Sequence, residues 1–244
     1  MPGYIHHVEW CVSDLQTQVQ VLVSHYGFEP IAKRVRKIDE KWLAEQILVQ
    51  SGATVFLLTQ KSRLTKTSTV QAVQANEYPV LVCCDQDHIR DTVFNVCLVV
   101  GQYVNEITAK IEAFEPSSVL VHPNDKCTGL LSVVKSCCGN IIHTLLEKKF
   151  KILPGFEEIG DKSAFGKSWN DNCLRTTHMD HVTYVCHQGQ SQKILQWYHK
   201  MFKMRRFFVN PQVNSKIKIP REIATWKVCL QFLNFGGKTQ TLEF

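Results

Sequence analysis

The chain has 244 residues, of which 44% are hydrophobic and 20% charged, a composition typical of a globular protein with a substantial core. No apolar run approaches the ~20 residues of a membrane-spanning helix, so we expect no membrane span. The net charge is +6, but the basic stretches 33–37 and 203–206 are short and lack an aromatic RNA-reading motif, which argues against nucleic-acid binding. For 33–37 we expect a solvated strand edge.

Two features bear on the compartment of the protein. The N-terminus leads almost directly into a strand-like segment, without the apolar core of a secretion signal or an Arg-rich presequence. We therefore expect a cytoplasmic protein, with a mitochondrial location as the alternative. The ten cysteines show no C-x-x-C spacing, and the doublets Cys83-Cys84 and Cys137-Cys138 lie in strand-like apolar runs. In a chain of this length without an export signal, we interpret them as buried free thiols.

The first sixty residues predict a strand, a helix and then further strands. Residues 5–12 alternate and are β-branched, as expected of a strand. A helix is predicted between Asp14, a suitable N-cap, and Gly27, a glycine that ends it. Its expected inner side consists of Leu15, Val19, Leu22, Val23 and Tyr26. Two strands follow at 44–49 and 54–58, joined by a turn.

The same order of elements is predicted twice more. The second copy comprises a strand at 92–100, a helix at 102–114 and strands at 118–122, 130–134 and 140–147. A polar stretch with several Pro and Gly residues, 151–177, is the predicted linker. The third copy comprises a strand at 181–186, a helix at 192–202, an extended segment at 206–209 and strands at 226–232 and 239–244. The expected inner side of its helix consists of Ile194, Leu195, Tyr198 and Phe202.

A register match supports the repeat. Residues 5–10 (IHHVEW) read like residues 179–184 (MDHVTY), 174 positions later, and the match continues without a gap as far as Phe28 and Phe202. Repeats of this length indicate duplicated domains. We therefore expect residues 1–150 to form one complete module of two units, 151–177 a linker, and 178–244 only the first unit of a second module. On this interpretation the chain is a C-terminally truncated fragment.

Four motifs give the chain a resemblance to a known family. They are residues 139–148 (GNIIHTLLEK), 153–156 (LPGF), 179–182 (MDHV) and 197–199 (WYH). In this order they resemble the 4-hydroxyphenylpyruvate dioxygenase family, dioxygenase-like members included, within the vicinal-oxygen-chelate superfamily. The resemblance covers about residues 4–210. It implies an α+β fold in which repeated βαβββ units form a cup for a metal ion.

The resemblance implies a non-haem Fe(II) dioxygenase that acts on an aromatic α-keto acid. In that family two histidines and one glutamate of the second module hold the iron and leave adjacent positions open for the keto acid and dioxygen. His181 matches the first ligand. The positions of the other two, 174 residues after Asn95 and Glu147, fall near 269 and 321, beyond Phe244. We therefore expect this polypeptide alone to be catalytically incompetent, with Fe(II) as the family cofactor and His181 its one metal ligand here.

The first module has its own residues at the equivalent positions. These are His7, Asn95 and either His143 or Glu147, because residues 143 and 147 share one face of a strand. Asparagine is a poor iron ligand, so we interpret this set as a vestigial metal site. His6 precedes His7 in the strand and is expected to point the other way, so that the two do not chelate a metal.

Two other functions stay open. In one, the chain is a non-catalytic binding or regulatory module whose N-terminal cup serves assembly or ligand sequestration. In the other, it is a glyoxalase-type or bleomycin-binding dimer in which the third units of two chains pair and bring two His181 residues together. An unpaired third unit would expose an open sheet edge and apolar surface. A homodimer, or another association through that unit, is therefore the expected assembly.

Overall fold

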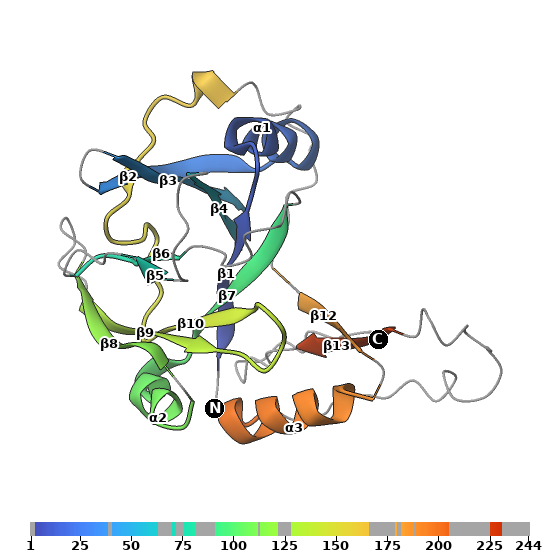
Figure 1. The fold of residues 1–244 in the computed structure, drawn as a ribbon. Helices are drawn as coiled ribbons and strands as arrows, with labels where there is room; N and C mark the ends of the chain where they lie inside the picture. Colours follow the sequence, from blue (N-terminus) through green and yellow to red (C-terminus); the bar gives the residue numbers. More distant parts are fainter. Residues whose placement is uncertain are drawn as a thin grey trace.

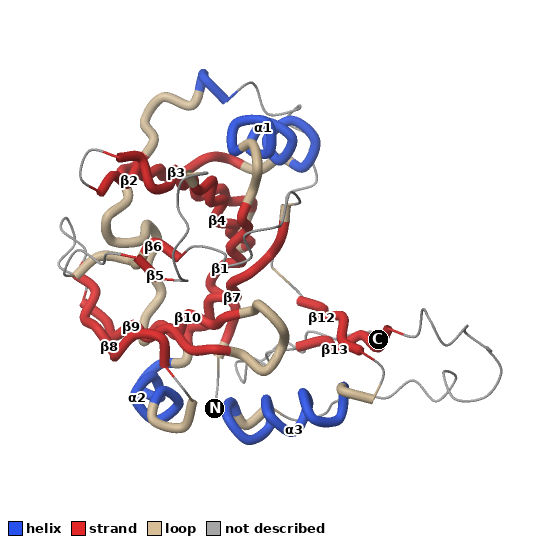
Figure 2. Tube along the Cα trace, viewed as in Figure 1, coloured by secondary structure: helices blue, strands red, loops and turns tan. Residues whose placement is uncertain are grey.

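The computed structural model describes a set of residues that spans most of the first two units and part of the third. They are residues 3–38, 41–62, 70–71, 76–81, 91–111, 113–121, 128–165, 179, 182–187, 189–204 and 225–230. Two units with the order βαβββ share one sheet, and a third group of elements packs beside them (Figure 1). Figure 2 shows that strands dominate and that the helices lie at the periphery.

The first unit follows the predicted order. It comprises β1 (Tyr4–Cys11), α1 (Leu15–Tyr26), β2 (Glu29–Ile38), β3 (Lys41–Ser51) and β4 (Thr54–Lys61). Both predicted ends of the helix are confirmed, since Asp14 accepts a hydrogen bond from the Thr17 amide at 3.0 Å and Gly27 has a left-handed φ of 67°. The expected inner side is buried except for Tyr26, which is 60% exposed. Tyr26 lies in the last turn, and Phe28 enters the core after the chain turns.

The second unit has a shorter helix than predicted. It comprises β7 (Thr92–Val99), a 3-10 turn (Gly101–Tyr103), α2 (Val104–Thr108), β8 (Ala113–Val121), β9 (Thr128–Lys135) and β10 (Ile142–Leu146). The helix predicted over 102–114 is wrong in its second half because β8 already pairs with β9 from Ala113 onward. Val104 and Ile107 are the buried residues of the short helix that remains.

The two units join through their first strands at the centre of one sheet. The strand order is β11-β2-β3-β4-β1-β7-β10-β9-β8, in which β11 is Glu157–Glu158. β1 pairs antiparallel with β7, and each pairs in parallel with the last strand of its own unit, β4 or β10. Two short strands, β5 (Val70–Gln71) and β6 (Val80–Leu81), pair separately. This arrangement gives the module a curved inner face, onto which alternate residues of the central strands point.

Part of the predicted linker packs against the first module. Leu153 and Phe156 are buried in its core, and β11 forms an antiparallel pair with β2. A 3-10 turn at Ser163–Phe165 follows.

The third unit rests on the outer face of the first module. It comprises β12 (Val182–His187), α3 (Ser191–Phe202) and β13 (Thr225–Leu230), and β12 pairs antiparallel with β13. Its predicted elements at 206–209 and 239–244 lie outside the described residues. The buried side of α3, formed by Ile194, Tyr198 and Phe202, packs in one cluster with Val96 and Leu145 of the first module. None of the described helices is long and apolar enough to cross a membrane.

Two expectations about polar residues and thiols need correction. The basic stretch 33–37 lies in β2, between β11 and β3. Lys33 and Lys37 are exposed as expected, but Arg34 is only 4% exposed because it points to the inner face. Cys137 is exposed and Cys138 partly exposed, because both lie in the turn after β9 rather than in a strand. Cys97 is a buried free thiol. The other doublet, 83–84, lies outside the described residues.

Candidate functional site

The inner face of the first module carries a group of buried polar side chains, which we call the buried polar cluster. It comprises His6, His7, Glu9, Arg34, Gln46, Thr59, Tyr78, Asn95 and Thr144. Most come from β1, β7, β10 and the strands β2 to β4, because alternate residues of these strands face inward. This is the place where the sequence predicts a vestigial metal site.

Glu9 accepts hydrogen bonds from three side chains. Its carboxylate lies 2.6 Å from Thr59 Oγ1, 3.2 Å from Gln46 Nε2 and 3.2 Å from Asn95 Nδ2. Burial raises the pKa of the Glu9 carboxyl to about 7, although these hydrogen bonds and the charge of Arg34 act in the opposite direction. Near neutral pH the carboxyl is therefore present in both its protonated and its ionised form.

Arg34 is the buried cation of the cluster. Its Nε donates to Gln46 Oε1 at 3.0 Å, and its Nη1 donates to the Tyr78 carbonyl oxygen at 2.6 Å. The guanidinium carbon lies 4.3 Å from the ring centroid of Phe156. Burial lowers the pKa of Arg34 to about 9, so the side chain stays charged at neutral pH. Gln46 bridges Arg34 and Glu9, since its oxygen accepts from one and its nitrogen donates to the other.

Asn95 has its hydrogen-bonding groups occupied by the cluster. Its Nδ2 lies 2.9 Å from Thr144 Oγ1 and 3.2 Å from the Tyr78 hydroxyl, and its Oδ1 accepts from the Thr144 amide at 3.0 Å. The Tyr78 hydroxyl in turn lies 3.2 Å from His7 Nε2. The chain of contacts therefore runs without a gap from Glu9 to His7.

The expectation that His6 and His7 point to opposite sides is wrong. Their Nδ1 atoms lie 2.8 Å apart, and both side chains are buried. The cause is a β-bulge, because the pairing of β1 with β7 shifts register between Ile5 and His7. A bulge inserts an extra residue and redirects its side chain, which overrides simple alternation.

The expectation that His143 or Glu147 faces the cup is also wrong. Thr144 faces it, and His143 points to the outer face, where its Nε2 lies 2.8 Å from the Tyr198 hydroxyl of α3. Burial lowers the pKa of His143 to about 4, so its ring is neutral. Glu147 follows the end of β10, and its carboxylate accepts a hydrogen bond from the Leu130 amide at 3.0 Å.

The residues of this cup do not fit Fe(II). A facial triad requires two imidazoles and a carboxylate beside open coordination positions. Here the equivalent positions hold one imidazole, one amide and one hydroxyl, from His7, Asn95 and Thr144, and each is already hydrogen-bonded within the cluster. The chemistry of these side chains therefore supports the interpretation that the first module lacks an iron site.

The cluster contains residues that the sequence did not single out. Gln46 lies in the predicted strand 44–49 and Thr59 directly follows the predicted strand 54–58. Alternation from buried neighbours such as Leu48 and Leu57 would have placed both inside. Arg34 was obscured by the charged residues around it. Tyr78 precedes a two-residue strand, and no local pattern in the sequence distinguishes it.

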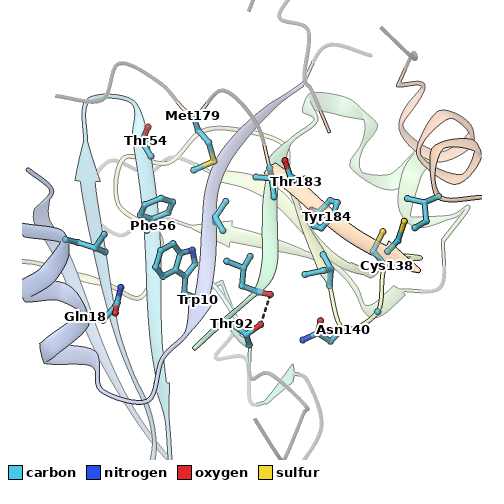
Figure 3. Close-up of a pocket in the computed structure, with 18 of the residues that line it drawn as sticks. Trp10, Gln18, Thr54, Phe56, Thr92, Cys138, Asn140, Met179, Thr183 and Tyr184 are labelled. Atoms are coloured by element: carbon cyan, nitrogen blue, oxygen red, sulfur yellow. Dashed lines mark hydrogen bonds between the residues drawn. The ribbon is translucent and has the colours of Figure 1, made fainter. Parts of the chain in front are cut away.

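His181 lies outside the described residues, but its nearest described neighbours in the chain line a pocket. Met179 and Val182, on either side of position 181, both line a cavity of about 1110 Å³. Its other walls include Trp10 and Phe56 of the first unit and residues of the turn after β9 (Figure 3). The pocket therefore lies between the first module and the third unit, with mostly apolar walls.

Comparison with known proteins gives relatives over most of the chain. No protein-family model matches it. The Homo sapiens 4-hydroxyphenylpyruvate dioxygenase-like protein is 28% identical over 200 residues, which cover 79% of this chain and 46% of that protein. The Rattus norvegicus protein of the same name is 24% identical over 212 residues, 84% of this chain and 50% of that one. The chain is a relative of the 4-hydroxyphenylpyruvate dioxygenase-like proteins. It spans about half the length of those that it matches.

A solved structure confirms the fold of the chain. A mutant of 4-hydroxymandelate synthase from Streptomyces coelicolor superposes with a TM-score of 0.56 at 15% identity, over 86% of this chain and 55% of that one. The chain thus has the predicted α+β vicinal-oxygen-chelate fold, in which two βαβββ units share one sheet.

Proposed function

We propose that the chain belongs to a non-haem Fe(II) dioxygenase-type protein that acts on an aromatic α-keto acid, with His181 as its first iron ligand. The similarity to a 4-hydroxyphenylpyruvate dioxygenase-like protein over 79% of this chain carries this proposal. The first module does not fit iron, so iron chemistry belongs to the module that begins near residue 178. When bound there, iron would supply the oxidising chemistry, while the chain would contribute one imidazole and part of a pocket wall.

We further propose the division into a complete module at 1–150, a linker at 151–177 and the first unit of the iron-binding module at 178–244. The packing of residues 151–159 on the first module supports a linker that begins as part of that module's surface. These 244 residues supply one of the three expected iron ligands, so by themselves they should not turn over a keto acid.

Oxygen consumption tests the proposal. The 244-residue protein, supplied anaerobically with Fe(II) and then with oxygen and 4-hydroxyphenylpyruvate, should consume no more oxygen than His181→Ala does. Keto-acid-dependent oxygen uptake that disappears in His181→Ala would refute the claim of incompetence. A longer protein that contains this sequence should bind iron and lose it in His181→Ala. Iron retention in that variant would refute the ligand assignment.

A second function, ligand binding without redox chemistry, is favoured by the pocket between the first module and the third unit. Its volume suits a drug-sized molecule, and its walls include the aromatic rings of Trp10, Phe56 and Tyr184. Binding of 4-hydroxyphenylpyruvate would quench or shift Trp10 fluorescence without oxygen uptake, and Trp10→Leu should abolish that change. A homodimer through the third unit would instead appear as a doubled mass in solution, with His181 near its partner copy.

A further inference from the structure

Three side chains with metal-binding atoms meet inside the first module. One ring nitrogen each of His6 and His7 and the sulfur of Cys97 all lie within 4.8 Å of one another, and all three residues are buried. His7 and Cys97 are partners across β1 and β7, and the β-bulge brings His6 to the same side. We call these residues the His–His–Cys group.

The outer nitrogens of the two histidines already have partners. His6 Nε2 lies 2.8 Å from the Phe150 carbonyl oxygen, and His7 Nε2 lies 3.2 Å from the Tyr78 hydroxyl. In metal sites a ligating histidine donates its other N–H to a carbonyl or similar acceptor, which fixes the orientation of the ring. The two Nδ1 atoms therefore face each other, and the hydrogen bonds of the two Nε2 atoms fix the orientation of the rings.

We propose that the His–His–Cys group binds one thiophilic metal ion, Zn²⁺ or Cu⁺, through His6 Nδ1, His7 Nδ1 and Cys97 Sγ. Thiolate and imidazole together select these ions over hard cations. With metal–nitrogen bonds of about 2.0 Å and a metal–sulfur bond of about 2.3 Å, a tetrahedral centre places the nitrogens about 3.4 Å apart and each about 3.6 Å from the sulfur. From the present Nδ1–Nδ1 separation of 2.8 Å, the two nitrogens open by about half an ångström.

Binding exchanges protons in a defined way. Without metal, burial and the neighbouring Glu9 raise the pKa of the Cys97 thiol, so it is protonated, and burial lowers the pKa of both histidines, so they are neutral. The Nδ1–H of one histidine then donates to the Nδ1 of the other. With metal, each histidine carries its single proton on Nε2, so the histidine that donated through Nδ1 changes tautomer; His6 then donates to Phe150 O and His7 to the Tyr78 oxygen. The Cys97 proton leaves to solvent, so one proton is released per metal ion.

Charge and position indicate a structural role. A Cu⁺–thiolate pair is neutral. Zn²⁺ would leave one positive charge in excess, which the ionised carboxylate of Glu9 would balance, since Glu9 is close enough to raise the pKa of Cys97. The ligands come from β1 and β7, which are the strands that join the two units. A metal ion here would therefore fasten the two halves of the sheet together. This site is separate from the iron site of the proposed function and includes sulfur, which that site does not.

Metal content of the full chain tests the proposal. Protein produced with added zinc and, separately, with added copper is purified without oxygen, and metal per chain is measured for wild type, Cys97→Ser and Cys11→Ser. Cys11 is the matched control because it lies in β1, the strand that pairs with the strand of Cys97, and is outside the group. Cys97→Ser should carry one ion fewer in the zinc arm or the copper arm, which identifies the metal, and Cys11→Ser should match wild type. Equal metal content in wild type and Cys97→Ser in both arms would overturn the proposal.

X-ray absorption on the wild-type protein decides the matter if Cys97→Ser fails to fold. One sulfur and two imidazole neighbours around the metal are expected, and a shell of nitrogen and oxygen alone would overturn the assignment. His6→Gln should also lose the ion and lower the melting temperature of the metal-loaded protein. His181→Ala should leave this metal in place, so failure here and failure of the iron assignment are distinguishable.

Discussion

His143 gives the sharpest stability prediction. Its ring is buried between the outer face of the sheet and α3, and this burial lowers its pKa from 6.5 to about 4. Below pH 6.5 the unfolded chain binds a proton at this position that the folded chain does not bind. The contribution of neutral His143 to stability is therefore present above pH 6.5 and is lost as the pH falls towards 4.

The size of the effect follows from the two pKa values. Linkage gives a loss of about 2 kcal/mol between pH 7 and pH 5 and about 3 kcal/mol by pH 4. His6 has a pKa of about 4 and adds a similar loss. Glu9, with a pKa raised to about 7, does the reverse: its contribution is lost as the pH rises through 7 and regained as the pH falls. Because these effects partly cancel in the whole protein, the quantity to compare is the difference in the free energy of unfolding between wild type and variant.

The assay is urea unfolding at pH 7, 6 and 5, with a chelator present, for wild type, His143→Gln and His25→Gln. At pH 7 His143→Gln should be less stable than wild type by about 1–3 kcal/mol, because the partners of the ring lose their contacts. Between pH 7 and pH 5 it should lose about 2 kcal/mol less than wild type. His25 is exposed on α1, so His25→Gln should follow wild type. The same slope with pH in wild type and His143→Gln would refute the reasoning.

Three further predictions concern groups described above. Glu9→Gln should stabilise the protein by about 3 kcal/mol more at pH 8 than at pH 4, because the buried carboxylate disfavours its ionised form; equal effects in urea unfolding at the two pH values would contradict this. Tyr198→Phe should lower the free energy of unfolding by about 1–3 kcal/mol, because it leaves His143 Nε2 without a donor, and it should speed amide exchange in α3. Unchanged exchange would count against it. Gly155→Ala should destabilise by about 1 kcal/mol or more, since φ is 89° and a Cβ would lie 2.6 Å from a carboxylate oxygen. Gly160→Ala has open space and should change thermal stability by less than about 0.5 kcal/mol, so equal losses would be the contrary result.

The order of elements was predictable because local signals agree with the fold. Asp14 and Gly27 mark both ends of α1, and alternation marks β1, β3 and β4. β2 was missed as a structured strand because its alternating basic residues resemble a solvated edge. The helix at 102–114 was overextended because α2 ends through tertiary pairing of β8, which leaves no stop signal in the sequence.

The cup could be placed from the sequence, but its contents could not. A bulge between Ile5 and His7 moved His6 to the inner side, and such bulges depend on pairing with a strand ninety residues away. Thr144, rather than His143, faces the cup. The repeat identifies the strand but does not determine which of its alternate residues point to the inner face, and a shift of one residue exchanges the two sets. Tyr78 reaches the cluster from an irregular segment, where the sequence has no helical or strand periodicity from which to predict burial.

The central place of β1 has a consequence for how the protein is made. This strand is synthesised before both of its neighbours, which are β4, about fifty residues later, and β7, about ninety residues later. Until both have been synthesised, two rows of backbone donors and acceptors on β1 have no permanent partner. The two units therefore do not fold independently, because β1 of the first unit completes its pairing only with β7, which is the first strand of the second unit. Synthesis that pauses before Val99 would leave the nascent chain with its middle strand half paired, a form that chaperones are suited to hold.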